Sequence, residues 1–320
     1  MFPSLYGVVS QGTAVPSGTT LYTVTTTGAQ THNIASLGVS AAVTVYWGDG
    51  NSDIYTGTAA RSHAYAGAGT WVVSVDEPLY VTTLSLSDNK ITLNSSEIAA
   101  ISNVNDFRAI SLKAGTFDSA DVVAWRPSYF WLLSMPAGYA GTFDSADVSA
   151  WRPSYFYLYS MPAGYAGTFD STDVSAWRPS YFWLLSMPAG YAGTFDSADV
   201  SAWRPSYFYL YSMPAGYAIT AGGGFADWST ITYFLMQNNG LLAATVDAIL
   251  WELYQASTVP RTASGGTINI SGSNAAPSGT YQAAASCPVT VATPGKEVAH
   301  ELKNDGCAVG FNKWSTVTTS

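Results

Sequence analysis

Charged residues are scarce in this chain, at 10% of 320 residues against a globular average of about 25%. Its 12 Lys and Arg are outnumbered by 21 Asp and Glu, which gives a net charge of −9. Because the sequence shows no stripe of Lys and Arg that could neutralise phosphates, we expect no nucleic-acid partner. The surface is left to Tyr, Trp, Thr, Ser and Gly, a composition typical of β-rich structure.

Long apolar runs are also absent. No run reaches the roughly 18–20 residues that a membrane-spanning helix needs, so we expect no membrane span. The first residues lack the basic and then apolar pattern of a secretory signal. We expect a chain that stays inside the cell or leaves by another route, such as assembly into a virus particle. The predicted location is extracellular or on a virion.

Cysteine and histidine are rare, with two and three residues respectively. Cys287 and Cys307 could form one disulfide or could be two free thiols, and their spacing does not decide between the two. The series Asp49, Asn51 and Asp53 superficially resembles a calcium loop but has Ile54 where that loop needs Gly.

Recognisable catalytic patterns are missing as well. The sequence has no Ser/His/Asp order, no Cys/His pair, no phosphate-binding Gly loop and no cluster of metal ligands. His63 is expected to be a structural hydrogen-bonding residue. We therefore predict a protein that is not an enzyme, with no cofactor and no metal.

The dominant feature of the sequence is a repeated unit that occurs four times, starting at Ala114, Ala140, Ala166 and Ala192. The four near-identical copies span residues 114–217. Their main difference is a Trp-x-Leu segment in the first and third copies that becomes Tyr-x-Tyr in the second and fourth. A fixed period of this length predicts a solenoid or array, and a hydrophobic content of 48% is ample for its core.

Weaker copies of a related pattern flank these units. Val81–Ile91 fits the pattern Leu-x-x-Leu-x-Leu-x-x-Asn-x-Leu at every position, and further matches begin at Phe107, continuing through Ile110 and Leu112, and at Ile231. Residues 80–283 thus resemble bacterial and phage leucine-rich repeat proteins. The resemblance implies one parallel strand per repeat, with Asn side chains that bond backbone groups where each strand turns away.

The segment after each strand is expected to return as a short helix. In the second copy Asp144 or Ser145 would cap this helix, and Val148 with Trp151 would form its apolar pair. Pro153 would prevent the helix from continuing.

The N-terminal part, residues 1–79, consists of short β-type runs separated by Gly, Ser and Asn, which predicts a β-sandwich. Trp47-Gly-Asp-Gly50, His63-Ala-Tyr65 and Gly69-Thr-Trp-Val-Val-Ser-Val75 together resemble the PKD family of Ig-like domains. This resemblance implies a spacer or adhesion module.

The C-terminal part, residues 284–320, is expected to cap the solenoid. We predict helices over Ala244–Tyr254 and Lys296–Lys303, a last solenoid strand at Ile268–Ile270, and a strand ending on Trp314 and Val317. The predicted fold class is therefore an N-terminal β-sandwich, an α/β leucine-rich repeat solenoid with a parallel β-sheet, and a C-terminal cap.

Two strand registers are open in the identical copies. In one, Phe156 and Leu158 point inward; in the other, Phe156, Tyr159 and Met161 do. The first is preferred because it keeps the constant Phe and Leu inside, where close packing tolerates least change.

The preferred register places a ladder of aromatic residues on the outer face of the sheet. Such a ladder either stabilises the sheet by cross-strand packing or forms a binding or self-association surface, since Tyr and Trp dominate binding hot spots and suit sugar rings. The candidate ligand-binding residues are Tyr129, Trp131, Leu133, Tyr155, Tyr157, Tyr159, Tyr181, Trp183, Leu185, Tyr207, Tyr209 and Tyr211.

These features together predict a non-enzymatic binding or adhesion protein, set in a phage virion or tail, whose partner is a surface glycan or protein. The alternative is a structural protein that assembles into homo-oligomers, a fibre or a larger particle through its repeats.

Overall fold

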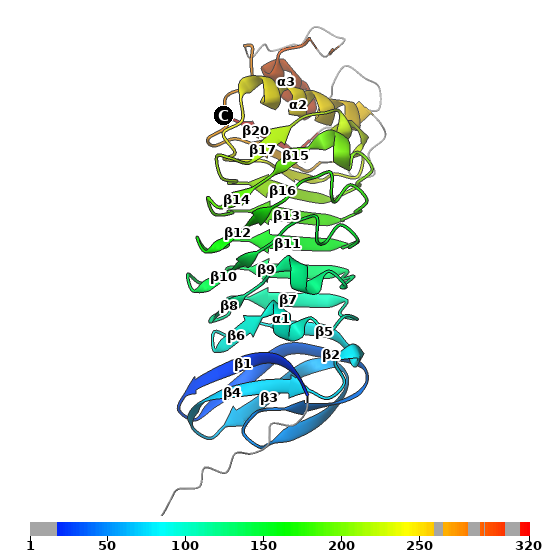
Figure 1. Cartoon of the computed structure of the whole chain (residues 1–320). Coiled ribbons are helices and arrows are strands. Elements are labelled where there is room, and N and C mark those ends of the chain that lie inside the picture. The colour runs from blue at the N-terminus through cyan, green and yellow to red at the C-terminus, as the bar shows by residue number, and fades with distance from the viewer. Residues whose placement is uncertain (1–17, 259–264, 281–288, 291, 305–313) are drawn as a thin grey trace, which may run out of the picture.

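The computed structural model describes residues 18–258, 265–280, 289–290, 292–304 and 314–320. Within these residues, an antiparallel N-terminal unit is followed by a long stack of short parallel strands, and two helices lie at the far end (Figure 1). Cys287 and Cys307 lie outside the described residues, so their bonding stays undecided. The segment between residues 305 and 313, which belongs to the predicted last strand, also lies outside them.

The N-terminal unit has four antiparallel strands. They are β1 (Thr19–Thr27), β2 (Gln30–Tyr46), β3 (Ser52–Tyr65) and β4 (Ala68–Val75). β1 pairs with β4 and β2 pairs with β3. The sequence predicts β-type runs over residues 21–25, 42–47 and 70–75. The first and third lie within β1 and β4, and the second lies in β2 except for its last residue, whereas the long strand β3 had no prediction of its own. The solvent-facing side chains of β3 are mostly polar or small, which leaves it without a strong apolar signal.

The antiparallel unit continues directly into the parallel stack. After the single 3-10 turn η1 (Pro78–Tyr80), strand β5 (Val81–Leu86) pairs antiparallel with β2 and parallel with β7 (Asp106–Ile110). A second short strand, β6 (Ile91–Asn94), pairs with β1. The two parts therefore share one sheet of 18 strands among the described residues, most of them parallel.

The repeats stack into a solenoid-like array in which each turn contributes strands to two parallel rows (Figure 1). The first row continues from β7 through β9 (Tyr129–Leu133), β11 (Tyr155–Tyr159), β13 (Tyr181–Leu185), β16 (Tyr207–Tyr211), β18 (Tyr233–Leu235), β19 (Thr267–Ile270) and β20 (Thr316–Thr319). The second row is β6, β8 (Ala114–Thr116), β10 (Tyr139–Thr142), β12 (Tyr165–Thr168) and β14 (Tyr191–Ala192), and β15 (Thr194–Asp196) pairs separately with β17 (Ala218–Thr220).

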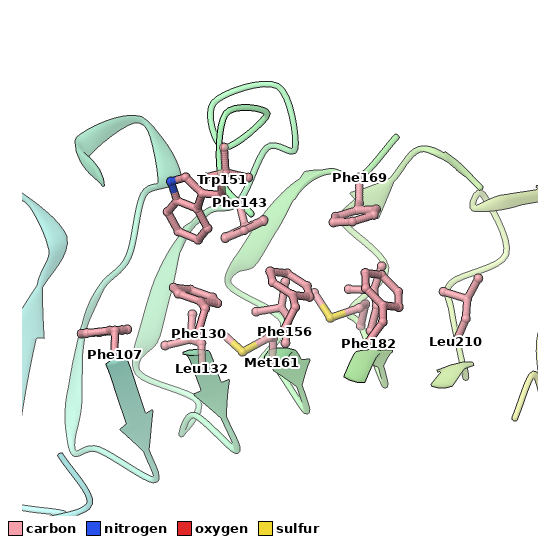
Figure 2. Packing of buried hydrophobic residues seen from close by; sticks show 14 of the residues in the cluster. Phe107, Phe130, Leu132, Phe143, Trp151, Phe156, Met161, Phe169, Phe182 and Leu210 are labelled. Atoms are coloured by element: carbon pink, nitrogen blue, oxygen red, sulfur yellow. The ribbon is translucent and has the colours of Figure 1, made fainter. Parts of the chain in front are cut away.

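A column of phenylalanines forms the centre of the stack (Figure 2). Phe130, Phe156 and Phe182 are fully buried, with ring centroids 5.7 and 5.5 Å apart between neighbours. One buried tryptophan per copy packs against the ring of the preceding repeat, as Trp151 does on Phe130 at 5.1 Å. Burial of this many large rings supplies the main stabilising term of the fold.

The register of the parallel strands decides between the two sequence alternatives. Phe156 pairs with Phe130 and with Phe182, and Leu158 pairs with Leu132 and Leu184. Phe156 and Leu158 are both fully buried, whereas Tyr159 is only partly covered. The register that points Phe156 and Leu158 inward is therefore confirmed. Met161 is also buried, but it lies in the turn beyond the strand.

The predicted alignment of the repeat that begins at Phe107 was wrong. The pattern predicted that Ile110 and Leu112 take the places of Leu84 and Leu86, but Phe107 pairs with Leu84 and Ala109 with Leu86. The first repeats, from Leu84 to Phe107 and from Phe107 to Phe130, are each shorter than the later copies. The sequence alignment assumed the longer interval of the later copies. It therefore placed the pattern three residues too far along the chain.

The return segments are shorter than predicted. Between β6 and β18, only α1 (Ser95–Ile98) is α-helical, for one turn, and η2 (Ser119–Val122), η3 (Ser197–Val200) and η4 (Gly224–Asp227) are single 3-10 turns. The predicted helix cap in the second copy, by Asp144 or Ser145, is therefore wrong. Asp144 Oδ1 instead accepts from the backbone N–H of Thr168, because the stacked repeat places that donor beside it.

A serine–aspartate ladder joins these turns. In each step the buried Ser hydroxyl donates to an aspartate of the next repeat, as Ser119 Oγ does to Asp147 Oδ2 at 2.6 Å. The same hydroxyl accepts the backbone N–H of Asp144 at 2.8 Å. The equivalent pairs are Ser95 with Asp121, Ser145 with Asp173, and Ser171 with Asp199. Polar groups that the turns bury are thereby satisfied between repeats.

Asparagine side chains satisfy the backbone at the C-terminal end of the stack. Asn239 Nδ2 donates to Leu210 O at 2.7 Å, and Asn274 Nδ2 donates to Met236 O at 2.7 Å. These two bonds are of the kind that the resemblance implies for the Asn of the repeat pattern, whereas Asn89 of the first match is exposed and its side chain forms no such bond among the described residues.

Two helices lie at the C-terminal end of the stack (Figure 1), α2 (Ala243–Thr258) and α3 (Gly295–Asn304). Both were predicted. Ile268–Ile270 lies in β19 as expected, but it is not the last strand, because β20 pairs parallel with it through Ile268 and Val317.

Candidate functional site

The outward side chains of β9, β11, β13 and β16 form three parallel columns, which we call the aromatic surface. Because alternate residues of a strand point to opposite faces, burial of Phe130 and Leu132 turns Tyr129, Trp131 and Leu133 outward, and the parallel register repeats this in every copy. All twelve residues predicted as ligand-binding lie in these columns. Ten are partly exposed, and Tyr157 and Leu185 are buried, at 7% and 2% exposed.

The first column is a stack of parallel tyrosine rings. Successive rings of Tyr129, Tyr155, Tyr181 and Tyr207 have centroids 4.5, 4.6 and 4.5 Å apart and lie within 15° of parallel. Tyr233 on β18 extends the stack at 4.7 Å. The rings therefore cover one another's faces and present mainly their edges to solvent.

The sequence prediction omitted Tyr233. The pattern match at Ile231 and Phe234 places Tyr233 directly before the inward Phe, as Tyr207 stands before Phe208. That spacing was the signal that could have identified it.

The second column alternates tryptophan and tyrosine, and its rings are not all parallel. Tyr157 stands edge-on between Trp131 and Trp183, at centroid distances of 4.9 and 4.4 Å and angles of 82° and 89°. Trp183 and Tyr209 stack at 4.8 Å with an angle of 13°. Burial raises the pKa of Tyr157, and burial followed by the neighbouring tyrosines raises the pKa of Tyr209 to about 12.

Arg108 covers the N-terminal end of the second column. Its guanidinium carbon lies 4.1 Å from the Trp131 ring centroid and 5.4 Å from that of Tyr129. Asp106 fixes its orientation through two bonds, from Nε to Oδ1 at 2.7 Å and from Nη2 to Oδ2 at 2.8 Å. A guanidinium held on an aromatic face in this way is an attractive cation–π contact. The sequence did not point to Arg108 and Asp106 as site residues, because they precede the identical copies.

The third column contains Leu133, Tyr159, Leu185 and Tyr211. Tyr159 and Tyr211 lie on the strands on either side of β13, which carries Leu185, and Leu185 is almost fully covered. Burial, followed by the charge of Tyr159, raises the pKa of Tyr211. The column is thus less open than its sequence suggested.

A shallow hollow of about 210 Å³ opens on the aromatic surface, lined by Trp131, Leu133, Tyr157 and Trp183. Its two tryptophans come from strands two steps apart, and strands are spaced about 4.8 Å apart. The edge-on ring of Tyr157 separates them. No charged side chain lines the hollow, so its chemistry is that of an apolar contact site.

His63 and the series Asp49, Asn51 and Asp53 make contacts that stabilise the N-terminal unit. His63 Nε2 lies 2.8 Å from Asp49 Oδ2 and its ring stacks on Trp47 at 4.8 Å, as expected of a structural hydrogen-bonding residue. Asp49 Oδ1 accepts the N–H of Asn51, and Asp53 Oδ2 accepts the Trp47 indole N–H. In the part of the chain that the structure describes, no three His, Cys, Asp or Glu residues are placed to hold a metal ion.

Comparisons of the chain with models of protein families, with curated proteins and with solved structures find no match in any of the three. Among the described residues, no helix combines the length and the apolar character needed to cross a membrane.

Proposed function

We propose that this chain is a non-enzymatic binding protein that uses the aromatic surface to hold a surface glycan or protein. The hollow between Trp131 and Trp183 is the observation that carries the proposal. Indole and phenol rings that already stack on their neighbours lose little conformational freedom on binding, and such rigid aromatic anchors dominate binding energies. A C–H face of a sugar ring or an apolar side chain fits the apolar lining.

We infer further that the N-terminal unit is a PKD-like β-sandwich spacer, and that the stack is a leucine-rich repeat solenoid whose C-terminal segment caps it. Contacts among the motif residues support the first inference, since the Tyr65 hydroxyl donates to Trp47 O at 2.9 Å and the Tyr65 ring stacks on Trp71. The amide bonds of Asn239 and Asn274 support the second. A setting in a phage virion or tail accords with a spacer that carries an extended binding surface.

The binding proposal is tested with a variant that empties the hollow. Trp131→Ala with Trp183→Ala removes both walls and leaves the inward Phe and Leu residues in place. We expect binding to a printed glycan array, or to intact bacterial cells, to fall at least tenfold, as for hot-spot residues. Tyr233→Ala is the matched control, because it removes an aromatic ring from the same face outside the hollow.

The outcome is unambiguous if folding is measured in parallel. Both variants should keep the wild-type circular dichroism spectrum. The proposal would be refuted if the double variant bound every glycan or cell type that wild type binds, and bound each of them equally well.

Self-assembly through the same surface is the second candidate. The apolar lining of the hollow favours it, because an identical apolar surface on a second copy would be complementary in chemistry. Sedimentation and electron microscopy over a concentration series would show oligomers or filaments if this function holds. A monomer at all concentrations would exclude it.

A further inference from the structure

Stacking of the identical copies creates a row of arginines. Arg126, Arg152, Arg178 and Arg204 each stand shortly before an outer strand, at the same position of their copies, and all four side chains are exposed. The segments that follow them are in parallel register, since Ser154, Ser180 and Ser206 each donate a backbone N–H to the serine one repeat earlier at 2.9 Å. The guanidinium groups therefore recur at the strand spacing of about 4.8 Å.

The four arginines adopt the same conformation. In each, Nη1 donates to the carbonyl three positions earlier and to the carbonyl of the preceding tryptophan. These bonds fix the side chain over the turn, and no bond among the described residues uses Nε or Nη2. Two donor groups per arginine thus remain for a ligand, in a geometry suited to carboxylates.

No acidic side chain of the described residues neutralises this row. Within that part of the chain none of the four arginines forms an ion pair, whereas Lys90 and Arg108 do. Each copy carries two aspartates, but these are engaged between repeats: Asp147 Oδ2 accepts from Ser119 Oγ and Asp118 Oδ1 accepts from Thr142 N. Four of the 12 basic residues thus stand in a row of mutually repelling charges. The expectation from the sequence that the chain has no stripe of basic residues was therefore wrong.

We propose that this row binds a linear acidic polysaccharide with a carboxylate on each ring. Three observations favour this ligand. The charges recur at equal steps along the stack, they are exposed, and their spacing is close to the length of one pyranose unit. An extended acidic peptide fits less well, because its residues rise about 3.4 Å each and those on one face recur at about 6.8 Å, so neither repeat matches the row. A second copy of this chain fits less well, because the aspartates of its identical copies are already engaged.

The proposal rests on the proposed binding function and adds a ligand class to it. The two can fail separately, because the arginine row shares no residue with the aromatic surface. Loss of binding on removing Trp131 and Trp183 tests the aromatic surface, and loss on removing the arginines tests the row.

The test uses the full chain with polygalacturonate as the probe and its methyl ester as the uncharged counterpart. We expect wild type to bind polygalacturonate at low salt, more weakly as salt rises, and not to bind the methyl ester. Arg152→Gln with Arg178→Gln should weaken binding about tenfold. Lys113→Gln with Lys303→Gln removes the same charge outside the row and should leave binding unchanged.

Any one of the following results would overturn the proposal. They are failure of wild type to bind polygalacturonate, equal binding to the methyl ester, and an equal loss in the lysine control. Tighter binding of single-stranded oligothymidylate than of polygalacturonate would assign the row to nucleic acid instead. Retention of the wild-type melting temperature by both double variants would show that the losses reflect binding and not folding.

Discussion

Glu252 on α2 accepts the hydroxyl hydrogen of Ser197 at 2.9 Å, and so occupies the place that an aspartate of the following repeat holds for each earlier serine of the ladder. One repeat period beyond Asp199 the sequence has Phe225, which carries no carboxylate. Glu252 comes from a helix far along the chain from Ser197. Helix α2 thus completes the last step of the serine–aspartate ladder with a side chain of equivalent chemistry.

Removing Glu252 should destabilise the end of the stack. The carboxylate is buried and also accepts the backbone N–H groups of Gly223 at 2.7 Å and Phe225 at 2.9 Å. Burial raises the pKa of Glu252, while these bonds oppose the rise. We expect Glu252→Ala to lower the free energy of unfolding by about 3 kcal/mol, because it leaves buried donors without acceptors. Urea denaturation followed by circular dichroism measures the change.

Glu252→Gln is the matched control for that loss. Its amide oxygen keeps one acceptor and its size fills the same space, so we expect a cost of about 1 kcal/mol. Equal losses in the Ala and Gln variants would show that both carboxylate oxygens are needed, because the Gln amide presents N–H groups where one of these acceptors stood.

Glycine is required where the second row of strands passes close to its neighbour. Gly141 has φ of +130°, and a Cβ there would lie 2.3 Å from Phe117 O. We expect Gly141→Ala to cost about 3 kcal/mol of folding free energy through the combined backbone strain and clash. Thermal unfolding measures it.

Gly138, slightly earlier in the chain, provides the comparison. A Cβ there would meet no atom within 4 Å. Gly138→Ala should change stability by no more than about 0.5 kcal/mol. A loss at Gly138 as large as that at Gly141 would contradict the argument.

Whole copies should be removable without unfolding the chain. Deleting residues 140–191, which are two complete copies, joins Tyr139 to Ala192 and leaves every ladder partner in sequence. Trp131 then lies beside Tyr209, a neighbouring pair that Trp183 and Tyr209 already form. We expect a cooperative transition with lower stability, because fewer repeat interfaces remain.

Deletion of half a copy supplies the contrast. Removing residues 140–152 would place a strand segment where a return turn belongs, and we expect a chain with no cooperative melting transition. Loss of the transition in the two-copy deletion would show that the copies are not interchangeable.

Acid should destabilise the junction between the N-terminal unit and the stack. His32 is fully buried, with Nε2 at 2.9 Å from the Tyr22 hydroxyl and Nδ1 at 3.0 Å from Asp88 Oδ2. Burial lowers the pKa of His32 from 6.5, with the nearby charge of Lys90 acting in the same direction and Asp88 opposing it.

The sign of the effect follows from proton uptake. Below pH 6.5 His32 of the unfolded chain takes up a proton that the folded chain does not, so stability falls with pH until the folded pKa is reached. We expect a loss of up to about 1.4 kcal/mol per pH unit, measured by denaturation at a series of pH values from 6.5 to about 5.

His32→Gln should flatten this part of the stability profile, although it lowers stability at every pH. His63→Gln removes the histidine paired with Asp49 in the same unit and should keep the slope. A slope that persists in His32→Gln would assign the acid sensitivity to another group.

The repeat period in the sequence predicted a parallel, solenoid-like stack and left two strand registers open. The constancy of Phe and Leu at alternate positions favoured the register that puts Phe156 and Leu158 inside and the variable Tyr and Trp positions outside, and the parallel strand pairing selected it. That periodicity is local information, so the twelve candidate residues could be named from it. It misled where the period shortened, at Phe107 and Ile110.

The contacts between repeats could not be predicted from the sequence. The edge-on setting of Tyr157, the guanidinium of Arg108 on Trp131 and the carboxylate of Glu252 beside Ser197 depend on residues brought together from different turns of the stack. The arginine row arises in the same way, because parallel stacking converts one repeat period along the chain into a distance of about 4.8 Å in space. A pattern read along the chain contains the period, whereas the distance between its members is set by the packing of one repeat on the next.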